Sequence, residues 1–253
     1  MNLYNNPISP AHRCEMSEEE IEDFSLIRTR AEKLLAIALQ FDRTNEATLF
    51  DSLRIVREEL ASNADFFLPR GYYCPSPVLD LIVGNCKRGK ILKRLTSRSR
   101  VSHRYIYGDQ GLMIIEYIGD KGITDCCNRE YLLREELKTI GVSFDRAGRI
   151  NQVSEELFED GRITDYFRAR FNGLDGNYRL YHSDHEQYSY DERGLCQCNF
   201  KYASHGYWPV INRETYIFNR ANGYLQSYYS VKNPSVIYTP KVKRLAMPPY
   251  FVK

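Results

Sequence analysis

Four side chains that could bind a metal or transfer protons cluster in HSDHEQYSYDE, which holds His182, Asp184, His185 and Glu186 within five residues. Histidine and carboxylate groups can bind a divalent metal or act as general acid and base. The spacing argues against a metal site, because two histidines three residues apart on a strand point to opposite faces. We favour a polar hairpin loop here and predict no metal, cofactor or catalytic residue. A metal-dependent enzyme or small-molecule binder using this cluster stays the alternative.

A basic segment runs from Lys87 to Arg104 and contains no acidic residue. Its cations are Lys87, Arg88, Lys90, Lys93, Arg94, Arg98, Arg100 and Arg104. Such a patch can bind phosphate or an acidic partner, so a nucleic-acid binder is a further alternative. The simpler interpretation is a solvated strand face whose charges offset acidic helices. We therefore do not expect a nucleic-acid partner.

The cysteines do not form zinc pairs, since neither Cys126-Cys127 nor Cys196-x-Cys198 has the usual two-residue gap. On a strand, Cys196 and Cys198 would share a face, and we expect buried, inert thiols. No GxSxG, HExxH, Walker A or GxGxxG motif is present. These observations favour a protein that is not an enzyme.

Tyr207 and Trp208 precede Pro209 in a segment with the composition of an interface hot spot. The alternative is that Trp208 anchors the core under a loop. Together with the tyrosines of the strands, they give a predicted partner-binding set of Tyr188, Tyr190, Tyr207, Trp208 and Tyr216.

Three segments have the pattern of amphipathic helices. Residues 17–41 begin with a capping box formed by Ser17 and Glu20, and their apolar residues recur at helical spacing. Residues 44–61 follow a short connection, which predicts an antiparallel helical hairpin. Residues 129–140 have an apolar side and precede Gly141, a residue type that commonly ends helices. The rest of the chain from Ile91 onward follows the two-residue period of strands.

One turn pattern recurs five times. It begins with an aromatic residue, which is usually followed by Asp or Asn, then a short spacer and a glycine. An aliphatic or aromatic residue comes next and starts a stretch with the two-residue period of a strand. YSYDERGLCQ, which starts at Tyr188, is the clearest copy. Asp or Asn can open a type I turn, and glycine supplies the positive φ of the following bulge. Five such hairpins predict an antiparallel meander in which each strand pairs with the next. We predict positive φ at Gly111, Gly148, Gly161, Gly194 and Gly223.

The unit Tyr188-Ser-Tyr190-Asp191-Glu-Arg-Gly194-Leu195 resembles the YD repeat of RHS-type proteins, whose units read roughly Tyr-x-Tyr-Asp-x-x-Gly-aliphatic. Residues 216–224 are similar, with one extra residue before the glycine. The partial resemblance covers roughly residues 105–230 and implies β-hairpin strands stacked in a sheet. It implies no catalytic residue, because these repeats are scaffold. It also implies a bacterial toxin system as the setting for this chain.

The composition is that of an ordinary soluble globular protein, with 43% hydrophobic residues, 27% charged residues and a net charge of +2. The chain has 20 Tyr and one Trp, and tyrosine suits half-buried sheet faces and binding surfaces. The N-terminal residues lack a signal-peptide pattern, and no apolar stretch approaches the ~20 residues that cross a bilayer. With 7 cysteines in no regular framework, we expect a cytoplasmic protein with no membrane partner.

The expected architecture is α+β, with an N-terminal helical hairpin packed on a long twisted antiparallel β-meander of YD-like hairpins. Residues 1–66 form the helical region and residues 67–253 the sheet region with its inserted helix, together one compact unit. Helices would cover one sheet face, and the other would offer tyrosines and charges to solvent or a partner. The predicted function is a non-catalytic protein-binding protein. Its most specific form is an immunity protein that neutralises a partner toxin.

Overall fold

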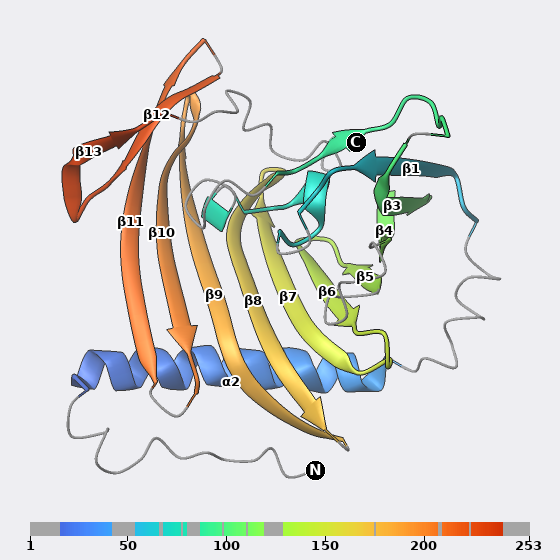
Figure 1. The fold of residues 1–253 in the computed structure, drawn as a ribbon. Helices are drawn as coiled ribbons and strands as arrows, with labels where there is room; N and C mark the ends of the chain where they lie inside the picture. The colour runs from blue at the N-terminus through green and yellow to red at the C-terminus, as the bar shows by residue number, and fades with distance from the viewer. Residues whose placement is uncertain are drawn as a thin grey trace.

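The structure is a computed structural model that describes most of the chain. It describes residues 16–41, 54–65, 68–76, 78–79, 87–97, 99–109, 111–118, 129–174, 176–206, 209–222 and 224–239. These residues form a single large antiparallel sheet with one long helix across it (Figure 1).

Helix α2 runs from Glu18 to Gln40 and confirms the helix predicted over residues 17–41. The capping box is formed, because Ser17 Oγ accepts from the Glu20 N–H at 3.2 Å and Glu20 Oε2 accepts from the Ser17 N–H at 2.9 Å. Acidic side chains fill the first turn, where the helix dipole favours them. One side of the helix is apolar and buried through Phe24, Ile27, Ala31, Leu34, Leu35 and Ala38.

The described residues contribute thirteen strands, and every neighbouring pair is antiparallel. The first five are β1 (Arg57–Ser62), β2 (Lys90–Ile91), β3 (Val101–Gly108), β4 (Gly111–Tyr117) and β5 (Arg129–Arg134). The central four are β6 (Lys138–Phe144), β7 (Ile150–Glu159), β8 (Arg162–Leu174) and β9 (Asn177–Asp191). The last four are β10 (Gly194–Ser204), β11 (Val210–Ala221), β12 (Tyr224–Ser230) and β13 (Asn233–Tyr238).

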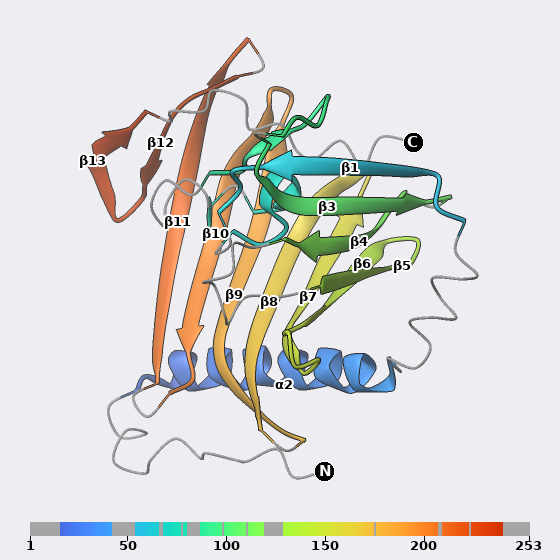
Figure 2. The same cartoon turned by 45° about the vertical axis from the view of Figure 1, so that its right-hand side comes forward.

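The predicted meander is confirmed, since β3 to β13 pair in chain order and only β1 is inserted between β3 and β2. Positive φ is found at Gly111, Gly148, Gly161 and Gly194, while Gly223 lies outside the described residues. The sheet twists so strongly that β1, β3 and β4 run across the direction of β8 to β11 (Figure 2). The identity of these hairpins as YD repeats stays a prediction.

The prediction of a second helix over residues 44–61 is wrong for the part of this range that the structure describes. Residues 57–62 form strand β1, which pairs with β3 and β2. Glu59 accepts a hydrogen bond from Tyr107 Oη at 2.8 Å, and the Arg57 guanidinium lies 4.0 Å from the centre of that ring. Contacts with distant residues therefore override the helix propensity of the sequence REELA.

The prediction of a helix over residues 129–140 is also wrong, because these residues belong to the β5–β6 hairpin. Tyr131 and Leu133 alternate along β5 and pack against the core beneath α2, which is a strand pattern. Leu137, which lies within the range of the predicted helix, is exposed at the turn. Gly141 lies inside β6 rather than at a helix end.

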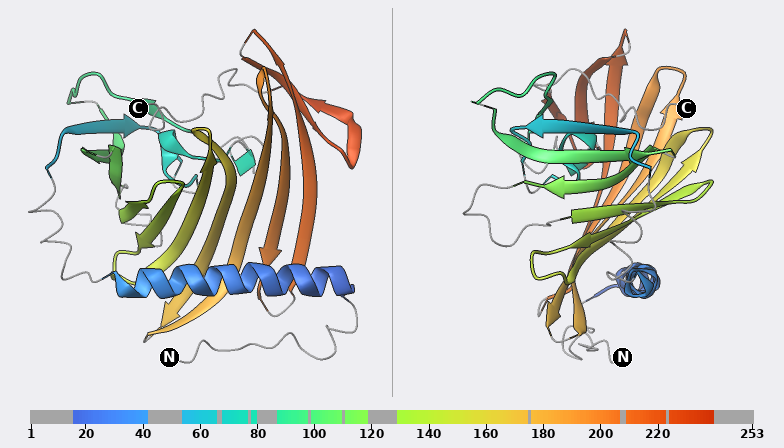
Figure 3. Two further views of the ribbon diagram at one scale, coloured as in Figure 1. Left: turned by 180° about the vertical axis from the view of Figure 1, so that it is seen from behind. Right: turned by 90° about the vertical axis from the view of Figure 1, so that its right-hand side faces the viewer.

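Helix α2 packs on one face of the sheet, across strands β7 to β11 (Figures 1 and 3). The core between them combines the apolar side of α2 with inward-facing residues of the strands. These include Ile106, Ile114, Ile140, Val142, Phe144, Val153, Phe167, Ala169, Phe171 and Ala203.

The opposite face is not open, contrary to our expectation. It lies beneath a segment that we call the cover, residues 68–76 and 78–79, which includes the 3₁₀ helix η1 (Gly71–Tyr73). Leu68, Cys74, Val78 and Leu79 of the cover pack on Tyr166, Tyr188 and Cys198, among other strand residues. Sequence periodicity could not foresee this, because the cover is a short irregular segment with no repeat.

Candidate functional site

The cover is fastened to the sheet by Arg70, whose side chain is completely buried. Its Nε donates to Glu130 Oε1 at 2.9 Å and its Nη2 to Ser154 Oγ at 3.0 Å, while its Nη1 pairs with Glu156. The backbone of Arg70 is held as well, since its N–H donates to Tyr117 Oη at 3.1 Å. These partners keep Arg70 at a φ of 60°, a left-handed conformation that side chains rarely adopt.

Gly141 makes room for this guanidinium. A Cβ at Gly141 would lie 2.8 Å from Arg70 Nη2 and would collide with Glu130 Oε1 and Ser154 Oγ. The residue that we predicted to end a helix therefore allows a buried charge network to lie directly on the sheet.

A second fastening joins Ser76 of the cover to Glu186 of β9. Ser76 Oγ donates to Glu186 Oε1, and it accepts from the N–H groups of Val78 and Leu79 at 3.1 and 2.9 Å. Tyr188 Oη donates to Glu186 Oε2 at 2.8 Å. Burial, the largest effect, raises the pKa of Glu186 to about 7, against the hydrogen bonds from Ser76 and Tyr188.

A third buried polar group lies between these two fastenings. Arg168 Nε donates to Asp184 Oδ2 at 2.8 Å, and both side chains are nearly inaccessible to solvent. Glu156, Tyr166 and Glu186 are direct neighbours across β7, β8 and β9, so all these groups share the cover face. Among the described residues, Tyr166 Oη and Arg168 Nη1 are buried without a hydrogen-bond partner.

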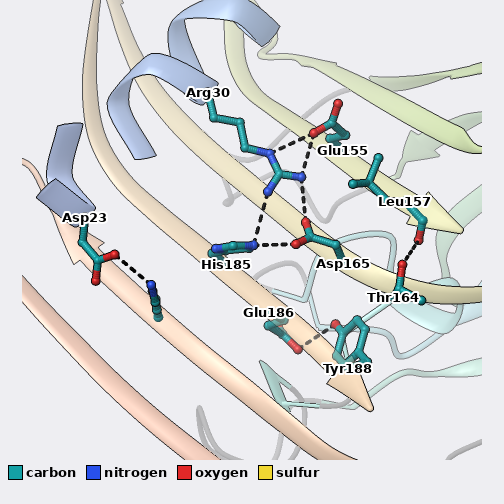
Figure 4. Close-up of polar contacts among 10 residues, drawn as sticks. Asp23, Arg30, Glu155, Leu157, Thr164, Asp165, His185, Glu186 and Tyr188 are labelled. Atoms are coloured by element: carbon teal, nitrogen blue, oxygen red, sulfur yellow. Dashed lines mark hydrogen bonds and ion pairs between the residues drawn. The ribbon is translucent and has the colours of Figure 1, made fainter. Parts of the chain in front are cut away.

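The face beneath α2 has its own polar contacts, shown in Figure 4. Arg30 of the helix reaches three strands, with Nη2 2.7 Å from Glu155 Oε2 and 2.6 Å from Asp165 Oδ1, and Nη1 3.2 Å from His185 Nε2. His185 Nε2 is also 2.7 Å from Asp165 Oδ2. Burial opposes ionisation of Asp165, but His185 and Arg30 outweigh it and lower the pKa of that carboxyl.

A second polar fastening of α2 lies at Asp23. Its carboxylate accepts from Lys201 Nζ at 2.8 Å and from Arg213 Nε at 2.7 Å. Partial burial raises the pKa of Asp23, but these two cations more than offset it and hold it below the usual range. Together, Arg30 and Asp23 fix the helix over β7 to β11.

The structure divides the predicted cluster of His182, Asp184, His185 and Glu186 between both sheet faces. His185 points to α2, whereas Glu186 points to the opposite face (Figure 4). Asp184 lies two positions before Glu186 on β9 and shares its face, where it pairs with Arg168. The cluster lies on strand β9 rather than in the hairpin loop that we favoured. Among the described residues, no group of three metal-ligand side chains could hold a metal ion.

The tyrosines of the predicted partner-binding set lie mostly inside the molecule. Tyr188 and Tyr216 belong to the core under the cover, and Tyr190 packs against it with Oη donating to Ile163 O at 2.7 Å. Their burial leaves them little surface to offer a partner. Tyr207 and Trp208 lie outside the described residues.

The basic segment does not form one surface. Arg88 donates to the carbonyls of Cys74 and Ser76 at 2.8 and 2.9 Å, which stabilises the cover. Arg104 pairs with Glu58 and Glu116. The exposed cations of the segment are Lys87, Lys90, Lys93, Arg94 and Arg100, and Arg98 lies outside the described residues.

The cysteine prediction is half right. Cys198 is buried, and burial raises the pKa of its thiol. The pairing of β9 with β10 slips between Leu195 and Gln197, so Cys196 lies at a bulge and stays partly exposed. The bulge breaks the alternation on which the prediction relied.

The comparisons with known proteins give no family. No protein-family model matches the chain, and no curated protein matches it either. Within the described residues, no helix is both long enough and apolar enough to cross a membrane.

Sequence reasoning missed Arg70, Glu130 and Glu156. The sequence offered one weak signal for Arg70. It is the one cation in the apolar and proline-rich run FFLPRGYYCPSP. Glu186 could have been placed better, since a residue two positions from a buried tyrosine shares its sheet face.

Proposed function

We propose that the chain is a non-catalytic protein-binding protein that contacts its partner through the β12–β13 hairpin. The observation that supports this is a set of exposed apolar side chains that we call the hairpin patch. It consists of Val231, Val236, Ile237 and Tyr238, which are 52%, 38%, 64% and 47% exposed. Every residue of β13 is exposed, and the hairpin projects from the body of the sheet (Figures 1 and 2). Exposed apolar patches of this kind commonly mark interaction sites.

The two edges of the sheet differ in a way that favours β13. Edge strand β2 has two residues and is followed by Lys93 and Arg94, which discourage pairing with another protein. Strand β13 has six residues and none is charged. A partner with an uncharged, apolar contact surface fits the hairpin patch best.

The partner is expected to contact side chains rather than add a strand. Pro234 has no N–H to donate, and the register between β12 and β13 slips between Tyr228 and Ser230. Both features disturb the backbone ladder that strand addition requires. The binding should therefore depend on apolar area and change little with salt.

The immunity function belongs to this proposal as its most specific form. It is supported by the resemblance of residues 105–230 to repeats that are used in toxin systems. The cytoplasmic place of action that it requires is the one expected from the cysteine content and the N-terminal residues. Its test is co-expression of the captured partner with and without this chain. Rescue of growth from a toxic partner would support neutralisation.

The experiment for the proposed function is affinity capture followed by binding of the purified partner. The test variant is Val236→Ser with Ile237→Ser. The control is Leu26→Ser with Leu137→Ser, which changes two other side chains that are 62% and 64% exposed. We expect the test variant to weaken binding at least about tenfold, as loss of a central apolar contact does.

Equal binding by the test variant and wild type would overturn the proposal. Equal loss in both variants would also overturn it, because the contact would then not be specific to the hairpin. Capture of nucleic acid that is released by salt would instead favour the exposed cations of residues 87–100.

A further inference from the structure

The two fastenings of the cover differ in charge. Arg70 brings a cation to Glu130 and Glu156, so opposite charges meet at that end. Ser76 brings only a hydroxyl to Glu186. Apart from the two hydrogen bonds from Arg88, the Ser76 end of the cover therefore depends on a carboxyl group that the cover itself does not neutralise.

The surroundings of Glu186 offer little compensation for a negative charge. From β8 it faces Arg168 and Tyr166, but Arg168 is already paired with Asp184. From β9 it faces Tyr188 and the Asp184 carboxylate, which repels it. From β10 it faces the Cys198 thiol at 3.8 Å, and from the cover Ser76. Among the described residues, Glu186 forms no ion pair of its own.

Ionisation of Glu186 in the closed arrangement thus buries a charge that has two hydroxyl donors but no cation of its own, which is costly. Opening the Ser76 end would bring water to the carboxylate and remove that cost. Arg70 would stay in place, because Glu130, Ser154 and Glu156 hold its side chain and Tyr117 holds its N–H group. The pKa of Glu186 in the closed arrangement, about 7, lies within the range in which such a change can be driven by pH.

We propose that residues 74–76 and 78–79 form a proton-sensitive flap, closed while Glu186 is protonated and open when Glu186 is ionised. The Arg70 end of the cover is the fixed end. Arg88, which lies just before β2, binds the carbonyls of Cys74 and Ser76, and opening of the flap breaks these two hydrogen bonds. Opening exposes Cys198 and Tyr188, which the closed flap buries.

The test uses two thiols on one strand. Cys198 lies under the flap, and Cys196 lies two residues away and is partly exposed, so it serves as the internal reference. The protein is alkylated briefly with iodoacetamide at pH 6, 7 and 8, and modification at each cysteine is measured by mass spectrometry. The ratio of Cys198 to Cys196 modification removes the ordinary pH dependence of thiol reactivity.

We expect this ratio to rise about tenfold between pH 6 and pH 8 in the wild type, since opening lowers the Glu186 pKa toward its ordinary value. In Glu186→Gln the ratio should stay low at all three pH values. In Ser76→Ala it should already be high at pH 6, because the fastening itself is lost.

A ratio that does not change with pH in the wild type would overturn the proposal. So would a rise of the same size in Glu186→Gln, because another group would then control opening. Circular dichroism of each variant at pH 6 shows whether it is folded. If Glu186→Gln fails to fold, Tyr188→Phe serves instead, because it removes a donor to the carboxylate and should move the rise to higher pH, whereas an unmoved rise would overturn the proposal.

Discussion

Arg70 shows how one side chain can decide the arrangement of a distant segment. Its guanidinium bonds Glu130 on β5 and both Ser154 and Glu156 on β7, and every partner is buried. A cation buried this deeply is tolerated only because its partners are close and carry opposite charge. The same contacts leave both carboxylates dependent on Arg70.

We predict that Arg70→Met destabilises the protein by about 3–5 kcal/mol, because two buried carboxylates lose their cation. The matched control is Arg193→Met, which removes an exposed cation paired with Asp191 and should change stability by about 1 kcal/mol or less. Urea denaturation of both variants measures the difference. Similar midpoints for the two would show that the buried network contributes little.

Glu186 gives the protein a pH-dependent stability with a defined sign. The pKa of its carboxyl is raised to about 7 in the folded state, above the value of about 4.3 in an unfolded chain. The unfolded state therefore loses this proton at lower pH, and folded stability falls as pH rises from about 4.3 to about 7.

We predict that Glu186→Gln removes this loss of stability. The variant should gain stability relative to the wild type as pH rises from 5 to 8, because it cannot acquire the buried charge. Denaturant titrations at several pH values measure the difference. A difference between the two proteins that stays constant from pH 5 to 8 would contradict the assignment.

At the scale of elements, α2 is held on the sheet by a narrow apolar side together with polar contacts at Asp23 and Arg30. Leu35 is almost fully buried in this core, whereas Leu26 on the same helix is 62% exposed. Substitution of either leucine by alanine changes the intrinsic helix propensity by the same amount. A difference in stability between the two variants therefore measures the contribution of packing.

We predict that Leu35→Ala costs about 2–5 kcal/mol of stability, because it removes buried contacts and leaves a cavity. Leu26→Ala should cost less than about 0.5 kcal/mol, as surface substitutions usually do. Thermal or urea denaturation of the two variants provides the measurement. Equal effects would mean that the helix is not packed on the sheet as described.

At the scale of the whole molecule, coverage of the sheet changes from its centre to its end. Strands β7, β8 and β9 lie between α2 on one face and the cover on the other. At the far end, every residue of β13 is exposed, and only Tyr228 and Ser230 of β12 pair with it. Local stability should follow this gradient.

Amide hydrogen exchange tests that expectation. We predict that amides of β7 to β9 exchange slowest and those of β13 fastest. The exchange rates of these two groups should differ by several orders of magnitude. Opening of the central strands requires loss of both coverings, whereas β13 can detach alone. Uniform protection across all strands would show instead that the sheet opens only as one unit.

Some features of this protein were determined by the sequence alone. The start of α2 follows from Ser17 and Glu20, whose hydrogen bonds are local. The hairpins follow from the turns at Gly111, Gly148, Gly161 and Gly194, because each closes a contact between residues close in sequence. Consecutive hairpins of this kind leave few alternatives to an antiparallel meander.

The features that depend on contacts between residues distant in sequence were decided only by the tertiary structure. REELA becomes strand β1 because β3 offers it hydrogen bonds, and residues 129–144 become a hairpin because β4 and β7 pair on either side. The covering of the second sheet face depends on Arg70 reaching Glu130 and Glu156, which are 60 and 86 positions away. Local periodicity carries no information about such partners, since burial and pairing arise only when the whole sheet is formed.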